Sequence, residues 1–93
     1  MKIAINKCYG GFGLSKKAYE FLGMEWDGYG YDFYDYSKRN DPKLIECIET
    51  IGCDVASGKY AKINIVEIPD DVSWEIKEYD GFEWVAEPHR IWS

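Results

Sequence analysis

An Asp-Gly dipeptide near the end of the chain, Asp80-Gly81, constrains the fold more than any other feature of the sequence. It lies between two segments rich in β-branched and aromatic residues, 74–79 and 82–87. Asp-Gly favours a two-residue loop of type I′, because both central residues of that turn have positive φ angles. The sequence therefore predicts an antiparallel hairpin. The pairs expected across it are Tyr79 with Phe82, Lys77 with Trp84, and Ile76 with Val85.

Both faces of this predicted hairpin are partly apolar. One face carries Trp74, Ile76 and Val85, and the other carries Tyr79, Phe82, Trp84 and Ala86. An apolar sheet face has to be covered to be stable in water. We expect helices to cover one face, and the aromatic loop (residues 24–38), a second subunit or a ligand to cover the other. The pattern thus predicts self-association as a dimer or higher oligomer.

The remaining segments predict a two-layer α+β domain that spans residues 1–93, with two helices packed on a small, mostly antiparallel sheet and a C-terminal β-meander. Strands are expected at 2–7 and 62–68. One helix is expected over 16–22, with Ser15 as its N-cap and Gly23 as its left-handed terminator. A second is expected to begin at Pro42 and to end near Ile51. Residues 24–38 are expected to form a long ordered loop, 53–60 a connector, and 89–93 a short tail.

The charge of the chain narrows the classes of partner. A formal net charge of −6 argues against a general DNA-binding or membrane-binding protein. Residues 67–87 carry eight carboxylates and one lysine, whereas residues 1–23 carry four lysines and one glutamate. The acidic stretch is expected to be a solvated face, or else a catalytic pair or a nucleic-acid-like surface.

The cysteines and the single histidine give no sign of a metal or disulfide site. Cys8, Cys47 and Cys53 are odd in number and lack CxxC spacing. No signal peptide and no apolar run long enough to span a membrane is recognised, so we expect a reduced, cytoplasmic protein without a metal or cofactor. Cys8 and His89 are a candidate catalytic pair, and a buried Cys8 is the alternative.

The candidate binding motif is a glycine turn, Tyr9-Gly10-Gly11-Phe12-Gly13, between the first predicted strand and the first predicted helix. Closely spaced glycines expose main-chain N–H groups, and the helix start behind them adds partial positive charge. This combination suits a phosphate. It matches neither a Walker loop nor the full dinucleotide fingerprint. The alternative is a tight connection in which glycine is required only by the backbone geometry.

Aromatic residues make up 17% of the chain and include four Trp and eight Tyr. Many lie in 24–38, where they are expected to stack on a base, to bind a partner, or to cover an exposed sheet face. Arg39, His89 and Arg90 are expected to contact phosphate or ribose, or else to be solvated. The full set of candidate ligand-binding residues is Tyr9, Gly10, Gly11, Phe12, Gly13, Ser15, Lys16, Trp26, Tyr29, Tyr31, Arg39, His89, Arg90 and Trp92.

Two longer phrases of the sequence are KIAINKCYGGFGLS at the start and KINIVEIPDDVSWEIKEYDGFEWVAEPHRIW at the end. They resemble a family of small phage and prophage proteins without an assigned function. The resemblance implies a phage context and transfers no catalytic residues. Small acidic phage proteins are often counter-defence factors. Some sequester immune nucleotide signals, such as cyclic ADP-ribose isomers or cyclic dinucleotides, and others block a defence protein directly.

We therefore expect a non-enzymatic protein that sequesters a phosphate-containing nucleotide signal. The amides of residues 9–13 and Ser15 would hold phosphate, and Lys16, Arg39 or Arg90 would balance its charge. Aromatic side chains would enclose the base or ribose: Tyr9, Phe12, Trp26, Tyr29, Tyr31 or Trp92. The alternative is an inhibitor that binds a host defence or nucleic-acid-processing protein through its acidic hairpin and Tyr-rich loop. A third hypothesis is a small nucleotide hydrolase.

Overall fold

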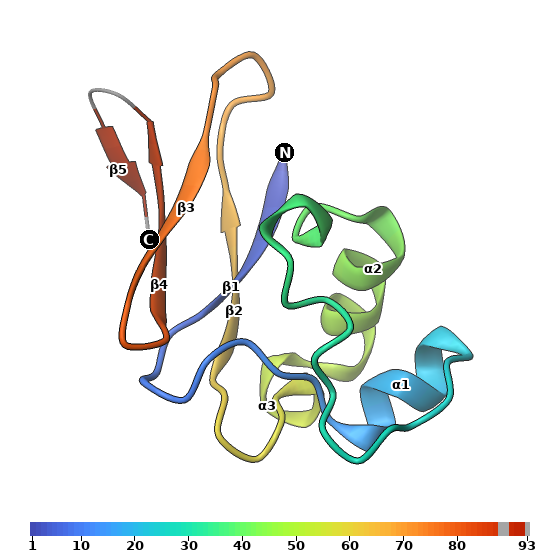
Figure 1. Ribbon diagram of the computed structural model, residues 1–93. Coiled ribbons are helices and arrows are strands. Elements are labelled where there is room, and N and C mark those ends of the chain that lie inside the picture. Colours follow the sequence, from blue (N-terminus) through green and yellow to red (C-terminus); the bar gives the residue numbers. More distant parts are fainter. Residues whose placement is uncertain (88–89, 93) are drawn as a thin grey trace.

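The computed structural model describes residues 1–87 and the backbone of residues 90–92. It is an α+β fold, as predicted from the sequence. The elements, in chain order, are β1 (Lys2–Asn6), α1 (Lys16–Leu22), the 3-10 helix η1 (Tyr36–Lys38), α2 (Pro42–Ile51), α3 (Cys53–Ala56), β2 (Ile63–Glu67), β3 (Glu75–Tyr79), β4 (Phe82–Glu87) and β5 (Arg90–Trp92) (Figure 1).

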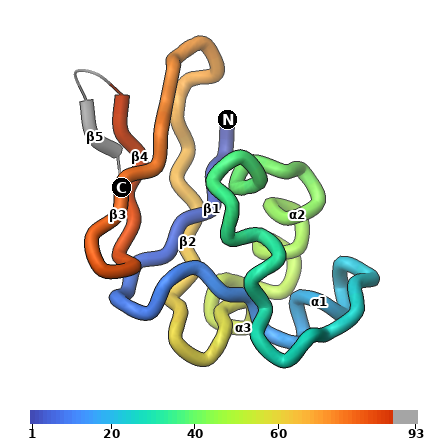
Figure 2. The backbone as a smooth tube through the Cα atoms, in the orientation of Figure 1, coloured from blue at the N-terminus to red at the C-terminus, as the bar shows by residue number. Residues whose placement is uncertain are grey.

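The strands form two antiparallel sheets where the sequence predicted one. Strands β1 and β2 pair with each other, and β3, β4 and β5 form a separate three-stranded sheet. Figure 1 shows the β1–β2 pair in the middle of the molecule, with the helices on one side and the three-stranded sheet on the other. The backbone trace in Figure 2 shows the same arrangement. The chain therefore has three layers, and β1–β2 is the central one.

The hairpin has the predicted register. Tyr79 pairs with Phe82, Lys77 with Trp84, and Ile76 with Val85. Asp80 has a φ of 52° and Gly81 a φ of 91°, as a type I′ turn requires. The predicted C-terminal tail is in part a strand, because β5 pairs with β4 and extends this sheet.

The two long helices begin and end as predicted. The Ser15 side chain accepts a hydrogen bond from the Ala18 N–H at 3.2 Å, and Gly23 closes α1 with a φ of 70°. Asp41 caps α2 through the Lys43 N–H at 2.8 Å. The expected connector after Gly52 contains the one-turn helix α3.

Strand β1 is buried on both faces because it lies between two cores. Ile3 and Ile5 face the core between the two sheets, with Val66, Ile68, Ile76 and Val85. Ala4 faces the core beneath the helices, which includes Leu14, Ala18, Tyr19, Leu44 and Ile48. In the described part of the chain, no helix has the length and apolar character needed to cross a membrane.

The segment 24–38 is an ordered loop, with η1 at its end. Asp27 Oδ1 accepts hydrogen bonds from the Tyr29 and Gly30 N–H groups, each at 2.8 Å. The Gly30 carbonyl in turn accepts the Leu14 N–H at 2.9 Å. These bonds fix the loop beside the glycine turn.

Candidate functional site

A buried ion pair between Arg39 and Glu83 holds the surroundings of the glycine turn together. Both side chains are almost completely buried, with residue exposures of 0% and 1%. Arg39 Nη1 lies 2.5 Å from Glu83 Oε1, and Nη2 lies 2.8 Å from Oε2. This bidentate geometry is the strongest that a guanidinium and a carboxylate form. It joins the end of the aromatic loop to strand β4.

The other donors of Arg39 fix the aromatic loop. Its Nε donates to the Phe33 carbonyl at 2.8 Å, and its Nη2 to the Tyr34 carbonyl at 2.9 Å. The guanidinium carbon lies 3.7 Å from the centre of the Phe12 ring, a cation–π contact. Phe12 itself is fully buried. Both side chains, which the sequence placed among the ligand-binding candidates, are thus used inside the fold, and neither lines the hollows described below.

Asn6 ties the glycine turn to the tip of the hairpin. Its Nδ2 donates to the Cys8 carbonyl at 2.7 Å and to the Gly81 carbonyl at 2.8 Å. Its Oδ1 accepts the Lys62 N–H at 2.8 Å. The Asn6 main-chain N–H donates to Glu83 Oε1 at 2.8 Å, which connects this residue to the ion pair.

Two glycines are required by close backbone contact. A Cβ atom on Gly10 would lie 1.9 Å from the Tyr60 carbonyl oxygen, and one on Gly81 would lie 2.6 Å from the Gly11 nitrogen. Neither distance is sterically allowed. A Cβ on Gly11 would make only an ordinary contact, 3.6 Å from Tyr34 Cε2, but Gly11 has a φ of 89°, which residues with side chains rarely adopt. The backbone geometry of this turn therefore does require glycine, which was one of the two interpretations of the sequence.

The main-chain amides of the turn are nevertheless unused. The N–H groups of Leu14 and Ser15 donate to the Gly30 and Ala56 carbonyls, both at 2.9 Å. Within the described residues, the N–H groups of residues 9–13 have no acceptor. Three of these five residues, 11–13, are buried. Buried N–H groups are almost always paired with protein, water or ligand.

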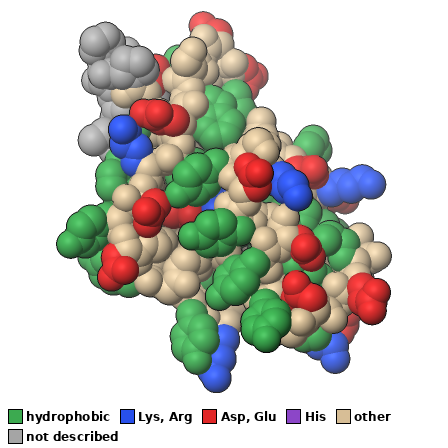
Figure 3. Space-filling view, in the orientation of Figure 1, with side chains coloured by type: hydrophobic (Ala, Val, Ile, Leu, Met, Phe, Trp, Pro, Cys, Tyr) green, Lys and Arg blue, Asp and Glu red, His purple; other side chains and the backbone are tan. Residues whose placement is uncertain are grey.

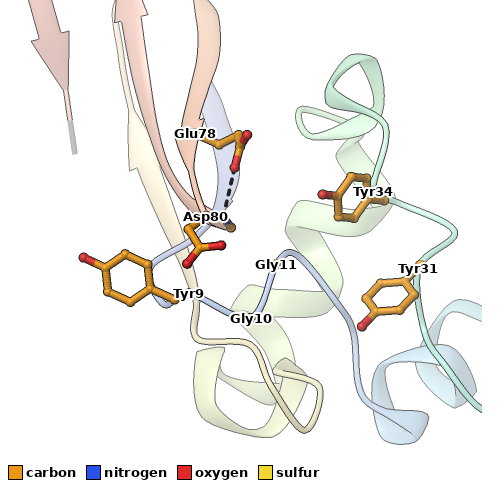
Figure 4. Close-up of a pocket in the computed structure, with 8 residues that line it drawn as sticks. Tyr9, Gly10, Gly11, Tyr31, Tyr34, Glu78 and Asp80 are labelled. Atoms are coloured by element: carbon orange, nitrogen blue, oxygen red, sulfur yellow. Dashed lines mark hydrogen bonds between the residues drawn. The ribbon is translucent and has the colours of Figure 1, made fainter.

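A large open hollow of about 760 Å³ lies above the turn. Figure 4 shows the hairpin tip on one side, Tyr31 and Tyr34 on the other, and Gly10 and Gly11 running between them. Its lining residues are Tyr9, Gly10, Gly11, Tyr31, Tyr34, Glu78, Asp80 and Gly81. In the space-filling view, hydrophobic side chains (tyrosine is coloured with them) gather across the middle of this face, with acidic side chains among them (Figure 3).

The wall that the hairpin contributes to the large hollow is acidic. Glu78 Oε2 accepts the Gly81 N–H at 2.9 Å, which fixes the carboxylate (Figure 4). Neither Glu78 nor Asp80 forms an ion pair with any described residue. The opposite wall is aromatic, with the Tyr31 and Tyr34 rings 6.0 Å apart and perpendicular. The Tyr9 ring points away from them and packs on Phe82, at 5.6 Å between centroids.

A small, more enclosed hollow of about 120 Å³ adjoins the large one and shares Gly11 and Tyr31 with it. Lys59 is the basic residue in its lining. The lining residues are Gly11, Gly13, Gly28, Tyr29, Tyr31, Gly58, Lys59, Tyr60 and Ala61. Sequence reasoning missed Lys59. The connector 53–60 that contains Lys59 was expected, but its approach to the glycine turn depends on the pairing of β1 with β2.

The structure brings six of the predicted site residues to these hollows: Tyr9, Gly10, Gly11, Gly13, Tyr29 and Tyr31. Besides Arg39 and Phe12, it keeps three others away from the hollows. Ser15 caps α1 and donates its Oγ to the Val55 carbonyl at 2.6 Å, Lys16 is exposed on α1, and Trp26 packs on Tyr19 at 5.2 Å. His89, and the side chains of Arg90 and Trp92, lie outside the described residues.

Burial raises the pKa of the Cys47 thiol. Burial also raises the pKa of the Cys53 thiol. Cys8 is half-buried, and its Sγ lies 2.9 Å from the Tyr60 carbonyl oxygen. Among the described residues, no group of three or more His, Cys, Asp or Glu side chains is placed to hold a metal ion.

The unpaired amides, the two hollows and their opposite charges are the features on which a function can be based. They lie on segments from four parts of the chain: the glycine turn, the aromatic loop, the turn before β2, and the hairpin tip. No protein-family model, curated protein or solved structure matches the chain, so what it binds has to be inferred from its own geometry.

Proposed function

We propose that the protein binds a nucleotide at the glycine turn and holds it without changing it chemically. The observation that supports this most is that the N–H groups of the buried residues 11–13 have no acceptor among the described residues, beside two adjoining hollows. Main-chain amides of a glycine-rich turn bind phosphate oxygens because they converge without steric hindrance. A ligand phosphate would supply the acceptors that the protein does not.

The second support is the size and lining of the large hollow. Its volume of about 760 Å³ is within the usual range for small-molecule sites. The faces of Tyr31 and Tyr34 offer aromatic surface on which a base can stack. Lys59 in the small hollow replaces Lys16 and Arg39 as the cation that would balance a phosphate.

Sequestration of a signal in phage counter-defence is the biological role that we propose for this binding. The resemblance of both ends of the chain to small phage proteins supports that role. A sequestering protein needs tight binding and no catalytic group. Self-association remains a prediction, which sedimentation of the purified protein would test.

The test is to mix the purified protein with cyclic mononucleotides, cyclic dinucleotides and ADP-ribose isomers. The protein is then separated, denatured by heat, and the released compounds are identified by mass spectrometry. Release of an intact compound supports the proposal. Release of an altered compound would show an enzyme instead, and no uptake at all would contradict nucleotide binding.

A matched pair of variants localises the uptake. Lys59→Gln removes the cation of the small hollow, and Lys62→Gln removes an exposed lysine nearby that lines neither hollow. Hydrogen bonds to charged groups contribute about 1.5–3 kcal/mol, so Lys59→Gln should weaken uptake roughly tenfold or more. Lys62→Gln should bind as the unmodified protein does.

A second candidate function is an inhibitor that binds a basic surface of another protein. The observation in its favour is that the acidic hairpin tip and the aromatic loop form opposite walls of the large hollow. Tyr29, Tyr60 and Tyr79 add further exposed aromatic surface, at 75%, 64% and 72% exposure. Tyrosine is enriched at such interfaces. Salt-sensitive binding of a basic protein, combined with no nucleotide uptake, would favour this function.

A further inference from the structure

The two hollows beside the glycine turn differ in charge. The small hollow has Lys59 in its lining, and the large hollow has Glu78 and Asp80. A phosphate and an unpaired carboxylate repel each other, so a nucleotide cannot place its phosphate equally well in both. A bound nucleotide is therefore oriented across the turn.

We infer that Glu78 and Asp80 accept hydrogen bonds from ribose hydroxyl groups, and that the phosphoryl group lies on the Lys59 side. The ligand class is then a ribonucleotide with free neighbouring 2′- and 3′-hydroxyls. This inference rests on the proposed function and adds the orientation and the sugar specificity of the same site.

The sizes of the hollows agree with this orientation. The small hollow, at about 120 Å³, is several times the ~10–15 Å³ that holds one water molecule and has room for a phosphoryl group. The large hollow, at about 760 Å³, has room for a nucleoside. Gly11 and Gly13, whose N–H groups have no acceptor among the described residues, line the small hollow, where phosphate oxygens would meet these N–H groups.

The carboxylates are suited to a diol. An ionised carboxylate only accepts hydrogen bonds, and a ribose offers two neighbouring O–H donors. The Gly81 N–H occupies Glu78 Oε2 at 2.9 Å, which fixes this side chain and leaves Oε1 for a ligand. Dinucleotide sites use an acidic residue on the ribose hydroxyls in the same chemical way.

The experiment compares the four ribonucleoside 5′-monophosphates with their 2′-deoxy counterparts by isothermal titration, with inorganic phosphate as a third probe. We expect each ribonucleotide that binds to do so at least about tenfold more tightly than its 2′-deoxy form, because a lost hydrogen bond leaves a charged acceptor unpaired. Phosphate alone should bind weakly and should shift the amide resonances of Gly11, Gly13 and Lys59.

Two conservative variants test the carboxylates. Asp80→Asn keeps the turn, because asparagine tolerates the φ of 52°, and Glu78→Gln keeps an oxygen for the Gly81 N–H. Both should reduce the preference for ribose to less than about threefold and leave phosphate binding unchanged. Glu75→Gln, on the same hairpin and in neither hollow, is the matched control and should keep the preference.

The outcomes separate the two proposals. Equal binding of ribo- and deoxyribonucleotides, or an unchanged preference in both carboxylate variants, overturns the inference while nucleotide binding stands. Absence of binding of every nucleotide and of phosphate overturns the inference together with the proposed function.

Discussion

Removing the carboxylate of Glu83 should destabilise the protein more than any other change to an acidic side chain of the hairpin. Glu83→Ala deletes both bonds to Arg39 and the acceptor of the Asn6 N–H. It leaves a fully buried guanidinium without its counterion. Breaking a buried ion pair on one side costs about 3–5 kcal/mol. That is a large part of the roughly 5–15 kcal/mol that stabilises a typical domain.

Urea denaturation followed by tryptophan fluorescence measures this loss of unfolding free energy. In thermal denaturation of a chain of 93 residues, 1 kcal/mol corresponds to about 4–8 °C, so the melting temperature should fall by about 12–40 °C. The control is Glu75→Ala on the adjacent strand, which removes an exposed pair with Lys77 at 3.2 Å. Exposed pairs contribute about 0–1 kcal/mol. A loss below about 1 kcal/mol in Glu83→Ala would refute the role assigned to the buried pair.

The double variant Arg39→Met/Glu83→Leu separates the ion pair from the other bonds of Arg39. It removes both charges, so no buried charge is left without a partner. It should be more stable than Glu83→Ala, yet less stable than the unmodified protein, because the Phe33 and Tyr34 carbonyls lose the donor that held them. Full recovery of stability would show that these loop carbonyls do not depend on Arg39.

Three further predictions concern the glycine turn, the aromatic loop and helix α1. Gly10→Ala should cost about 1–3 kcal/mol, as in other overpacked sites, because its Cβ would meet the Tyr60 carbonyl at 1.9 Å; denaturation in urea measures this. The Gly30 N–H bond, with a second main-chain bond, holds the pKa of Asp27 below its ordinary value of about 3.9. The ionised Asp27 therefore stabilises the fold above about pH 3.9, and this stabilisation is lost as the pH falls through the lowered pKa. The Gly30 amide resonance should titrate with a midpoint below about 3.9. Asp27→Asn should abolish that titration. Burial raises the pKa of Tyr19 to about 12. The contribution of the neutral Tyr19 side chain to the free energy of unfolding is therefore present below about pH 10 and is lost as the pH rises towards about 12. Tyr19→Phe should unfold at a higher alkaline pH than the unmodified protein.

The local features of the fold could be predicted because each is determined by neighbouring residues. The hairpin register follows from Asp80-Gly81, and both helix starts follow from a capping side chain at Ser15 or Asp41. The division into two sheets could not be predicted in the same way. It depends on which strands pair across long separations, and the sequence pattern of β1 and β2 fits either a shared sheet or a separate one.

The ion pair was missed because charged side chains are rarely buried and its partners lie 44 positions apart. One signal was present. In the predicted register Glu83 lies on the same hairpin face as Val85, two residues away, and that face was expected to be apolar. A carboxylate on an apolar face requires a partner, and Arg39 is the one that the fold supplies.

The glycine turn was identified from the sequence, whereas its surroundings were not. The turn has the predicted place between a strand and a helix, and Tyr9 and Tyr31 lie beside it. The predicted cations do not lie beside the turn in the same way, because Arg39 is buried and Lys16 is exposed on α1. Lys59, Glu78 and Asp80 reach the glycine turn from the turn before β2 and from the hairpin, so their positions follow from tertiary packing alone.

The most direct test of the account is an amide NMR titration of the protein with ADP-ribose, which carries phosphoryl groups and a free ribose. The account predicts saturable shifts of the Gly11 and Gly13 amides and of Lys59, with the resonances of helix α2 unchanged. Resonances of the turn that stay unmoved at millimolar concentrations of ADP-ribose, of cyclic dinucleotides and of inorganic phosphate would contradict it.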